Sequence, residues 1–194
     1  MDVAACHERG VAVCNICDWS VSVPEHVFAL LLALRRQLPR YQRAVAAGQG
    51  QASLTYGFVL PPLPVTLSGS VMGLIGYGAL GGQVAALARA FGMTPLIAER
   101  REAASVRAGR TLFGEVLARS DVLVILCPLT AETRDLIGVP EMARLPAGAL
   151  VINCARRHRE RGGAGRSAPA RRTRRGQGRC AVLATSSLSW TRPI

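Results

Sequence analysis

The chain has 194 residues, 49% of them hydrophobic, and carries a formal net charge of +12. This length suffices for a sizeable buried core, and no apolar run approaches the roughly 20 residues of a membrane-spanning helix. The N-terminus holds Asp2 and His7 rather than a basic stretch before an apolar one, so we predict no signal peptide and a cytoplasmic location.

The positive charge is concentrated in one segment. Residues 156–179 hold ten arginines against one acid, whereas residues 1–155 hold 13 arginines against 11 acids. All 24 basic residues are arginine, which indicates a GC-rich coding sequence more than a selected basic surface. An Arg-rich tail that binds nucleic acid remains an alternative interpretation.

Cys14 and Cys17 are the only cysteine pair with the spacing of metal ligands. A zinc site needs further ligands, and neither Cys6-His7 nor His26 supplies them at a usual separation. We therefore predict no metal site, and we expect the cysteines to be reduced in the cytosol.

Residues 1–66 are predicted to hold a fragment of a second domain, a crossover helix and a linker. Pro24 suits the first turn of a long helix that ends near Gly48. His26, near its start, could be a ligand or base, although its apolar neighbours favour a structural role. Three prolines within residues 57–66 exclude a helix there and indicate the linker.

A strand, a glycine-rich turn and a helix follow one another from Val71. The apolar residues 71–75 suit a buried parallel strand, and Gly76, Gly78 and Gly81 form a G-x-G-x-x-G turn. The first glycine permits the tight turn, the second lets the backbone approach a pyrophosphate, and the third lets the helix pack closely on the strand. The pattern predicts dinucleotide binding; a plain βαβ unit that uses the glycines only for packing is the alternative.

A second strand, residues 94–98, ends at Glu99. An acid eighteen residues past Gly81 can accept hydrogen bonds from the adenosine ribose hydroxyls. A carboxylate there favours NAD because it repels a 2′-phosphate, whereas Arg100 and Arg101 could accommodate NADP.

Two further strands, residues 121–126 and 149–153, end where ligands bind in open α/β sheets. Cys127 and Pro128 follow the first strand, and Arg156 comes shortly after the second. The planar guanidinium of an arginine can hold a carboxylate through two hydrogen bonds. An arginine at a strand end can equally be solvated, and the pattern leaves both readings open.

The predicted fold class is α/β, with a Rossmann-type, doubly wound and mainly parallel sheet in residues 67–156. The fragment of a second, substrate domain precedes it in residues 1–66. Residues 157–194 are predicted to be a disordered Arg-rich tail, because most of them are polar, small or charged.

From Asp2 to Arg156, about four-fifths of the chain, the sequence resembles the D-isomer-specific 2-hydroxyacid dehydrogenases, and most closely the glycerate dehydrogenase or hydroxypyruvate reductase branch. The segments that carry the resemblance are SVPEH at Ser22–His26, LSGS at Leu67–Ser70, the turn Gly76–Gly81, Ser120-Asp121, CPLTAETR at Cys127–Arg134 and VINCAR at Val151–Arg156.

The resemblance implies NAD-dependent or NADP-dependent interconversion of a small D-2-hydroxy acid, of the glycerate or glycolate type, and its 2-keto acid. It implies that Arg156 binds the substrate carboxylate and polarises the carbonyl. The expected cofactor-binding residues are Gly76, Gly78, Ala79, Leu80, Gly81, Glu99, Cys127, Pro128, Thr133, Cys154 and Ala155. Within this set, the pyrophosphate belongs to Gly78, Ala79 and Leu80, the ribose to Glu99, and the nicotinamide side to the last five. A homodimer is also implied, in which Leu30, Leu31 and Leu34 either form the contact or pack on the sheet.

The sequence departs from the family at both ends. Family members carry a further part of the substrate domain before the position of Met1, and a catalytic Glu and His after the position of Arg156. From Arg157 to Arg179 the only such residues are His158 and Glu160, whose context differs, so neither receives those roles.

We hypothesise a reading-frame slip near Arg157. Residues 157–161, RHRER, can be coded so that reading one nucleotide later gives Gly-Ile-Val-Asn-Glu, as the family would have after Arg156. Without the catalytic pair we expect impaired activity. The alternatives are a catalytically inactive dinucleotide-binding fragment and a nucleic-acid binder that uses the Arg-rich tail.

Overall fold

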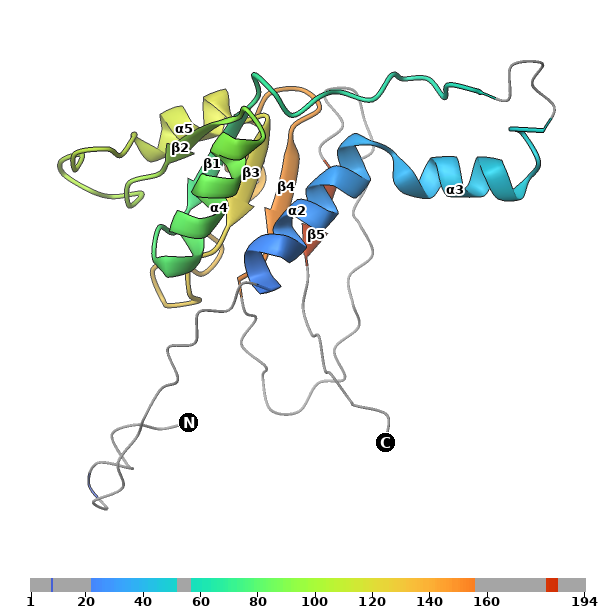
Figure 1. Ribbon diagram of the computed structural model, residues 1–194. Coiled ribbons are helices and arrows are strands. Elements are labelled where there is room, and N and C mark those ends of the chain that lie inside the picture. The colour runs from blue at the N-terminus through green and yellow to red at the C-terminus, as the bar shows by residue number, and fades with distance from the viewer. Residues whose placement is uncertain (1–7, 9–21, 52–56, 156–180, 185–194) are drawn as a thin grey trace.

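The computed structural model describes residues 8, 22–51, 57–155 and 181–184 (Figure 1). At its centre lies a five-stranded parallel sheet in the order β2-β1-β3-β4-β5. The strands are β1 (Val71–Ile75), β2 (Thr94–Ile97), β3 (Val122–Ile125), β4 (Leu150–Asn153) and β5 (Ala181–Ala184). The predicted Rossmann-type parallel sheet is thereby confirmed.

Helices cover both faces of the sheet. One face packs against α2 (Ser22–Arg35) and α4 (Ala79–Ala90), and the other against α5 (Phe113–Arg119) and α6 (Val139–Met142). Alternation along β3 explains the two cores, because Val122 and Val124 join the first and Leu123 and Ile125 the second. The strands are buried on both sides, and therefore read as continuous apolar runs.

The chain reverses direction across the sheet between β1 and β3. It runs from β1 through α4 to β2 at one edge, and then returns to β3 on the other side of β1. Ile75 lies opposite Ile125, and the Leu126 amide donates to the Ile75 carbonyl over 2.8 Å. The carboxyl ends of these two strands therefore frame a crevice at a topological switch point, where open α/β sheets bind their ligands.

The prediction of one continuous helix from Pro24 to near Gly48 is wrong, because the helix is interrupted in its middle. It consists of α2, which ends at Arg35, and α3 (Leu38–Ala46). Between them Gln37 adopts a left-handed conformation with φ of 55°. Pro39 lies in the first turn of α3, where a proline is tolerated because its missing N–H would have no intrahelical partner.

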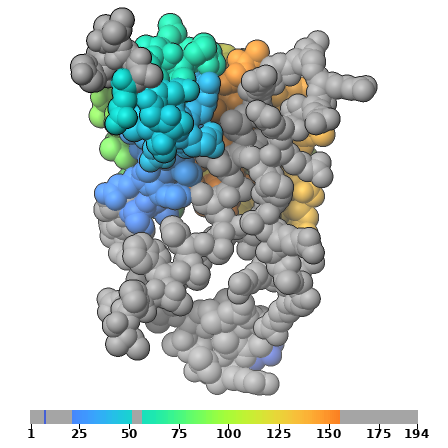
Figure 2. Space-filling view, turned by 90° about the vertical axis from the view of Figure 1, so that its right-hand side faces the viewer, coloured from blue at the N-terminus to red at the C-terminus, as the bar shows by residue number. Residues whose placement is uncertain are grey.

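The α3 helix extends away from the sheet as an arm (Figure 1). Its residues form a lobe above α2 when the molecule is turned by 90° (Figure 2). The Tyr41 ring lies 5.6 Å from that of Phe58, and the Tyr41 hydroxyl accepts a hydrogen bond from the Leu60 amide over 3.1 Å. The following segment, predicted as a linker, therefore folds back along this arm.

The tail that was expected to be disordered contributes a strand. Ala181–Ala184 pairs in parallel with β4, with Leu150 opposite Ala181, so the expectation for residues 157–194 is wrong at these four positions. The physical reason is that an Ala-Val-Leu-Ala run can extend the otherwise open edge of β4. Four residues are too few to show a periodic pattern, and the other tail residues lie outside the described ranges.

Among residues 22–51, 57–155 and 181–184, no helix combines the length and the apolar character needed to cross a bilayer. The domain boundaries at residues 66/67 and 156/157 stay predictions.

Candidate functional site

The glycine-rich turn begins where β1 ends. Gly76 has a φ of 98°, a left-handed conformation that side chains rarely adopt. A Cβ atom there would lie 2.6 Å from the Cys127 amide nitrogen and 2.9 Å from the Leu126 carbonyl carbon. The turn can therefore follow β1 so closely along the end of β3 only because this residue is glycine.

The second glycine faces open space. Gly78 is the N-cap residue of α4, no side chain caps the helix there, and a Cβ atom at Gly78 would have no neighbour within 4 Å. The first N–H groups of a helix lack intrahelical partners and carry a partial positive charge. The turn therefore has both the room and the donors for a pyrophosphate, at the predicted residues Gly78, Ala79 and Leu80.

The third glycine joins the helix to the turn. A Cβ atom at Gly81 would lie 2.5 Å from the carbonyl oxygen of Gly76. That oxygen belongs to the backbone and cannot swing aside as a side chain would. Gly81 thus sets how closely α4 approaches the turn that follows β1.

Glu99 lies two residues after the end of β2 and is 4% exposed. Its Oε1 accepts from the Arg100 amide over 2.9 Å and from Arg107 Nη2 over 2.5 Å. Its Oε2 accepts from the Arg107 amide over 3.2 Å and from Arg107 Nε over 2.8 Å. The side-chain hydrogen bonds from Arg107, followed by the Arg100 amide, hold the pKa of the Glu99 carboxyl far below its ordinary value.

A second wall of the crevice follows β3. The Thr133 hydroxyl donates to the Pro128 carbonyl over 2.6 Å and accepts from the Thr130 amide over 2.7 Å. Thr133 thus holds together the loop that follows β3, by bonding to the backbone of two of its earlier residues. Cys127 is half-buried at the start of this loop, and burial raises the pKa of its thiol.

One cleft of about 890 Å³ joins these parts. It brings together five of the predicted cofactor-binding residues: Gly76, Glu99, Cys127, Pro128 and Thr133. Four other predicted residues do not line it and follow Gly76 in the turn and in the first turn of α4: Gly78, Ala79, Leu80 and Gly81. Cys154 and Ala155 follow β4, and the Cys154 amide donates to the Ile125 carbonyl over 3.0 Å. Arg156, predicted to be catalytic, lies outside the described residues, as do Cys14, Cys17, His158 and Glu160.

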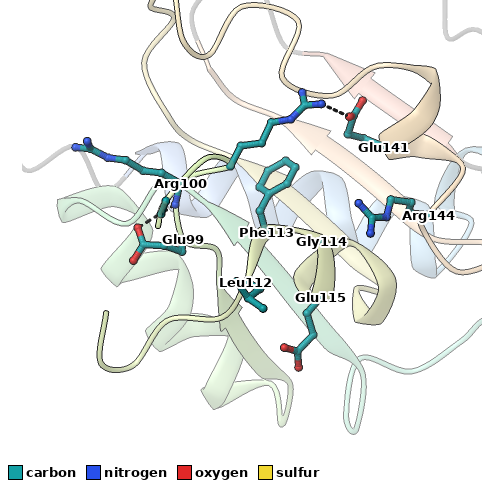
Figure 3. A pocket seen from close by; sticks show the side chains of 10 residues that line it. Glu99, Arg100, Leu112, Phe113, Gly114, Glu115, Glu141 and Arg144 are labelled. Atoms are coloured by element: carbon teal, nitrogen blue, oxygen red, sulfur yellow. Dashed lines mark hydrogen bonds and ion pairs between the residues drawn. The ribbon is translucent and has the colours of Figure 1, made fainter. Parts of the chain in front are cut away.

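A smaller cavity of about 430 Å³ lies beside Glu99, between the loop after β2 and helices α5 and α6 (Figure 3). Arg101 crosses it to Glu141, with 2.9 Å between Nη2 and Oε1. The Gly138 amide also donates to Glu141 over 2.8 Å, and it is the first cause of the lowered pKa of this carboxyl. This ion pair could not be predicted from the sequence, because Arg101 and Glu141 lie forty positions apart.

Two further arginines have contacts in the crevice that were not predicted from the sequence. Arg107 binds Glu99, and the Arg110 guanidinium lies over the Tyr77 ring, 5.8 Å from its centroid, and donates to the Ala98 carbonyl over 3.2 Å. Both come from the polar loop between β2 and α5. Such a loop has no periodicity that would indicate where its side chains point.

His26 lies in α2, and its Nε2 is buried without a hydrogen-bond partner in the described part of the chain. No three His, Cys, Asp or Glu side chains gather there as metal ligands do.

Comparison with known proteins agrees with this geometry. The family model described as "D-isomer specific 2-hydroxyacid dehydrogenase, NAD binding domain" matches residues 28–158. A protein of Haemophilus influenzae named as a 2-hydroxyacid dehydrogenase is 36% identical over 157 residues, which cover 80% of this chain and 50% of the relative. The glycerate dehydrogenase of Methylorubrum extorquens is 34% identical, with coverage of 80% and 48%.

Solved structures share the fold. The D-lactate dehydrogenase of Aquifex aeolicus, complexed with NAD and lactic acid, superposes with a TM-score of 0.67 at 30% identity, covering 80% of this chain and 46% of that one. The chain thus spans about half the length of the relatives it matches.

Proposed function

The chain belongs to the D-isomer-specific 2-hydroxyacid dehydrogenase family, and on that premise we propose that it binds NAD in the crevice between β1 and β3. We further propose that it interconverts a small D-2-hydroxy acid, of the glycerate or glycolate type, and the corresponding 2-keto acid. The observation that carries the proposal is the open space at Gly78, at the uncapped N-terminus of α4, two residues after Gly76, which lines the same cleft as Glu99.

Each part of the crevice suits one part of a dinucleotide. The amides of Gly78, Ala79 and Leu80 would hold the pyrophosphate, and Glu99 would lie beside the adenosine ribose. Bound there, NAD supplies the nicotinamide carbon that accepts or donates a hydride. The chain's own contribution at that end would be contacts from the loop that begins at Cys127.

Substrate orientation is assigned to a residue beyond β4, and no residue of this chain is assigned proton transfer. We propose that Arg156 holds the substrate carboxylate in two hydrogen bonds, a geometry that suits its guanidinium. Because His158 and Glu160 receive no catalytic role, we propose that turnover is impaired. Binding and turnover must therefore be measured separately.

The test uses the 194-residue protein. NADH binding is followed by its fluorescence, and the same preparation is assayed for NADH-dependent reduction of hydroxypyruvate and of glyoxylate. We expect saturable NADH binding that Gly78→Ala weakens and that the distant Arg119→Ala leaves unchanged. No NADH binding by the unaltered protein would refute the proposal. Binding without turnover would support the inactive dinucleotide-binding fragment.

We also propose a cytoplasmic homodimer. The arm that contains α3 carries exposed apolar side chains that a second copy would cover: Leu38, Val45, Val59, Leu63 and Val65. Leu31 is fully buried in the core, and Leu30 and Leu34 pack against the same core. This face of α2 therefore packs within one subunit, and the proposed dimer contact is assigned to the α3 arm instead. Light scattering during gel filtration tests the proposal, and a purely monomeric mass would contradict it.

A further inference from the structure

The carboxylate expected to receive the ribose already has a full set of partners. An ionised carboxylate offers about four acceptor positions. In Glu99 all four hydrogen bonds come from the chain itself, two from backbone amides and two from the guanidinium of Arg107. The hydroxyls of a ribose can therefore bind Glu99 only if some of these bonds are given up.

The guanidinium of Arg107 is the partner that can leave. Its side chain is 56% exposed, whereas that of Glu99 is 2% exposed, so Arg107 lies between the carboxylate and the solvent. The loop from Arg100 to Arg110 is exposed along almost its whole length, which makes a movement of this side chain easy. The other two donors are the backbone amides of Arg100 and Arg107, which do not depend on the position of that guanidinium.

We propose that Arg107 competes with the cofactor ribose for Glu99, and that it determines how well this site discriminates between NAD and NADP. With Arg107 in place, the charge of Glu99 is neutralised and no longer repels a 2′-phosphate. A dinucleotide without that phosphate must displace the guanidinium in order to reach the carboxylate. Arg107 therefore disfavours NAD and favours NADP.

The guanidinium can serve a phosphate without leaving Glu99. It carries five N–H donors, of which Glu99 accepts two through side-chain bonds. Arg100 and Arg101 line the same cleft, so a 2′-phosphate there would lie among three arginines. Charge-assisted bonds from arginine to phosphate are among the stronger hydrogen bonds in proteins.

This inference rests on the proposed dinucleotide site, and one experiment separates the two. Dissociation constants for NADH and NADPH are measured with the full chain, with Arg107→Ala and with Arg119→Ala. The control removes an exposed arginine that pairs with Glu115 over 2.6 Å, away from the crevice. AMP and adenosine 2′,5′-bisphosphate, measured by calorimetry, repeat the comparison with the adenosine half alone.

For the unaltered protein we expect the two dissociation constants to lie within about tenfold of each other. Arg107→Ala should raise the ratio of the NADPH constant to the NADH constant by about tenfold to hundredfold, the effect of one or two lost charged hydrogen bonds. NADH should bind as tightly as before, or more tightly. Arg119→Ala should leave the ratio unchanged.

A rise above about threefold in Arg107→Ala, absent from the control, supports the inference. A smaller rise, or a fall, overturns it while NADH binding by the unaltered protein upholds the proposed function. If the unaltered protein binds neither dinucleotide, both fail. A merely structural Arg107 would weaken both cofactors alike and leave the ratio constant.

Discussion

Two adjacent glycines in the first turns of α4 should respond in opposite ways to substitution by alanine. Gly81 and Gly82 lie in the same helix, so a methyl group gives both the same helix-propensity gain, about 1 kcal/mol. Their surroundings differ, because a Cβ at Gly82 would have no neighbour within 4 Å. Gly82→Ala is therefore expected to stabilise the protein slightly.

At Gly81 the added atom meets backbone. It would lie 2.5 Å from the Gly76 carbonyl oxygen, whereas real Cβ atoms essentially never come closer than 3.0 Å to another heavy atom. The turn cannot retreat, because Gly76 is itself held against Cys127. The helix must move instead, although Val84, Ala85 and Ala88 are fully buried. Overpacking of this kind costs about 1–3 kcal/mol.

Because the propensity gain cancels, the two variants should differ by about 1–3 kcal/mol in the free energy of unfolding. For a chain of this size that corresponds to a difference of about 2–12 °C in Tm. Urea denaturation followed by circular dichroism measures the free energy of unfolding. The values for the two variants can be compared directly if their m-values are equal. A Gly81→Ala protein as stable as Gly82→Ala would refute the close contact between α4 and the turn.

Three further predictions concern the crevice. Gly78→Ala should keep the Tm of the unaltered protein, because its Cβ meets no neighbour. It should weaken NADH binding about tenfold or more, because the methyl group would keep the pyrophosphate away from the amides of the turn; unchanged NADH affinity would contradict this. Glu99 has a lowered pKa, so its contribution to stability is present above the unfolded value of about 4.3 and is lost as the pH falls further. Thermal scans should therefore show that Glu99→Gln lowers the Tm by less at pH 3 than at pH 6. An equal lowering at both pH values would refute the stabilising ion pair between Glu99 and Arg107. Burial raises the pKa of the Cys127 thiol, so iodoacetamide should label it more slowly at pH 7.5 than it labels free cysteine. NADH bound in the cleft should slow this labelling further. Peptide mass mapping measures the labelling, and a Cys127 labelled as fast as free cysteine would contradict the prediction.

The βαβ unit was readable from sequence because its signals are local. The apolar run at β1 has strand length, the helical spacing of Val84 and Ala88 follows, and the three glycines stand where backbone approaches backbone. Glu99 could be placed because a strand of known direction ends just before it. The family resemblance rested on this glycine turn and on five other short segments between Ser22 and Arg156, and the match over residues 28–158 bears the family out.

Other features depended on contacts between distant segments. The break between α2 and α3 occurs at Gln37, which adopts a left-handed conformation. The only helix-breaking residue nearby is Pro39, two positions later, so the sequence did not predict the break. β5 forms because β4 offers it an edge. Such pairings are decided by which edge remains open, and that is a property of the assembled sheet.

The site divides in the same way. Sequence alone determined the backbone part, because a glycine turn at a strand end and the N-terminus of a helix have the same geometry wherever they occur. Tertiary structure alone decided the partners of the charged groups: Arg107 on Glu99, Arg101 on Glu141, and Arg110 over Tyr77. Long side chains from an exposed loop reach many positions, and only the folded chain shows which carboxylate or ring lies within their reach.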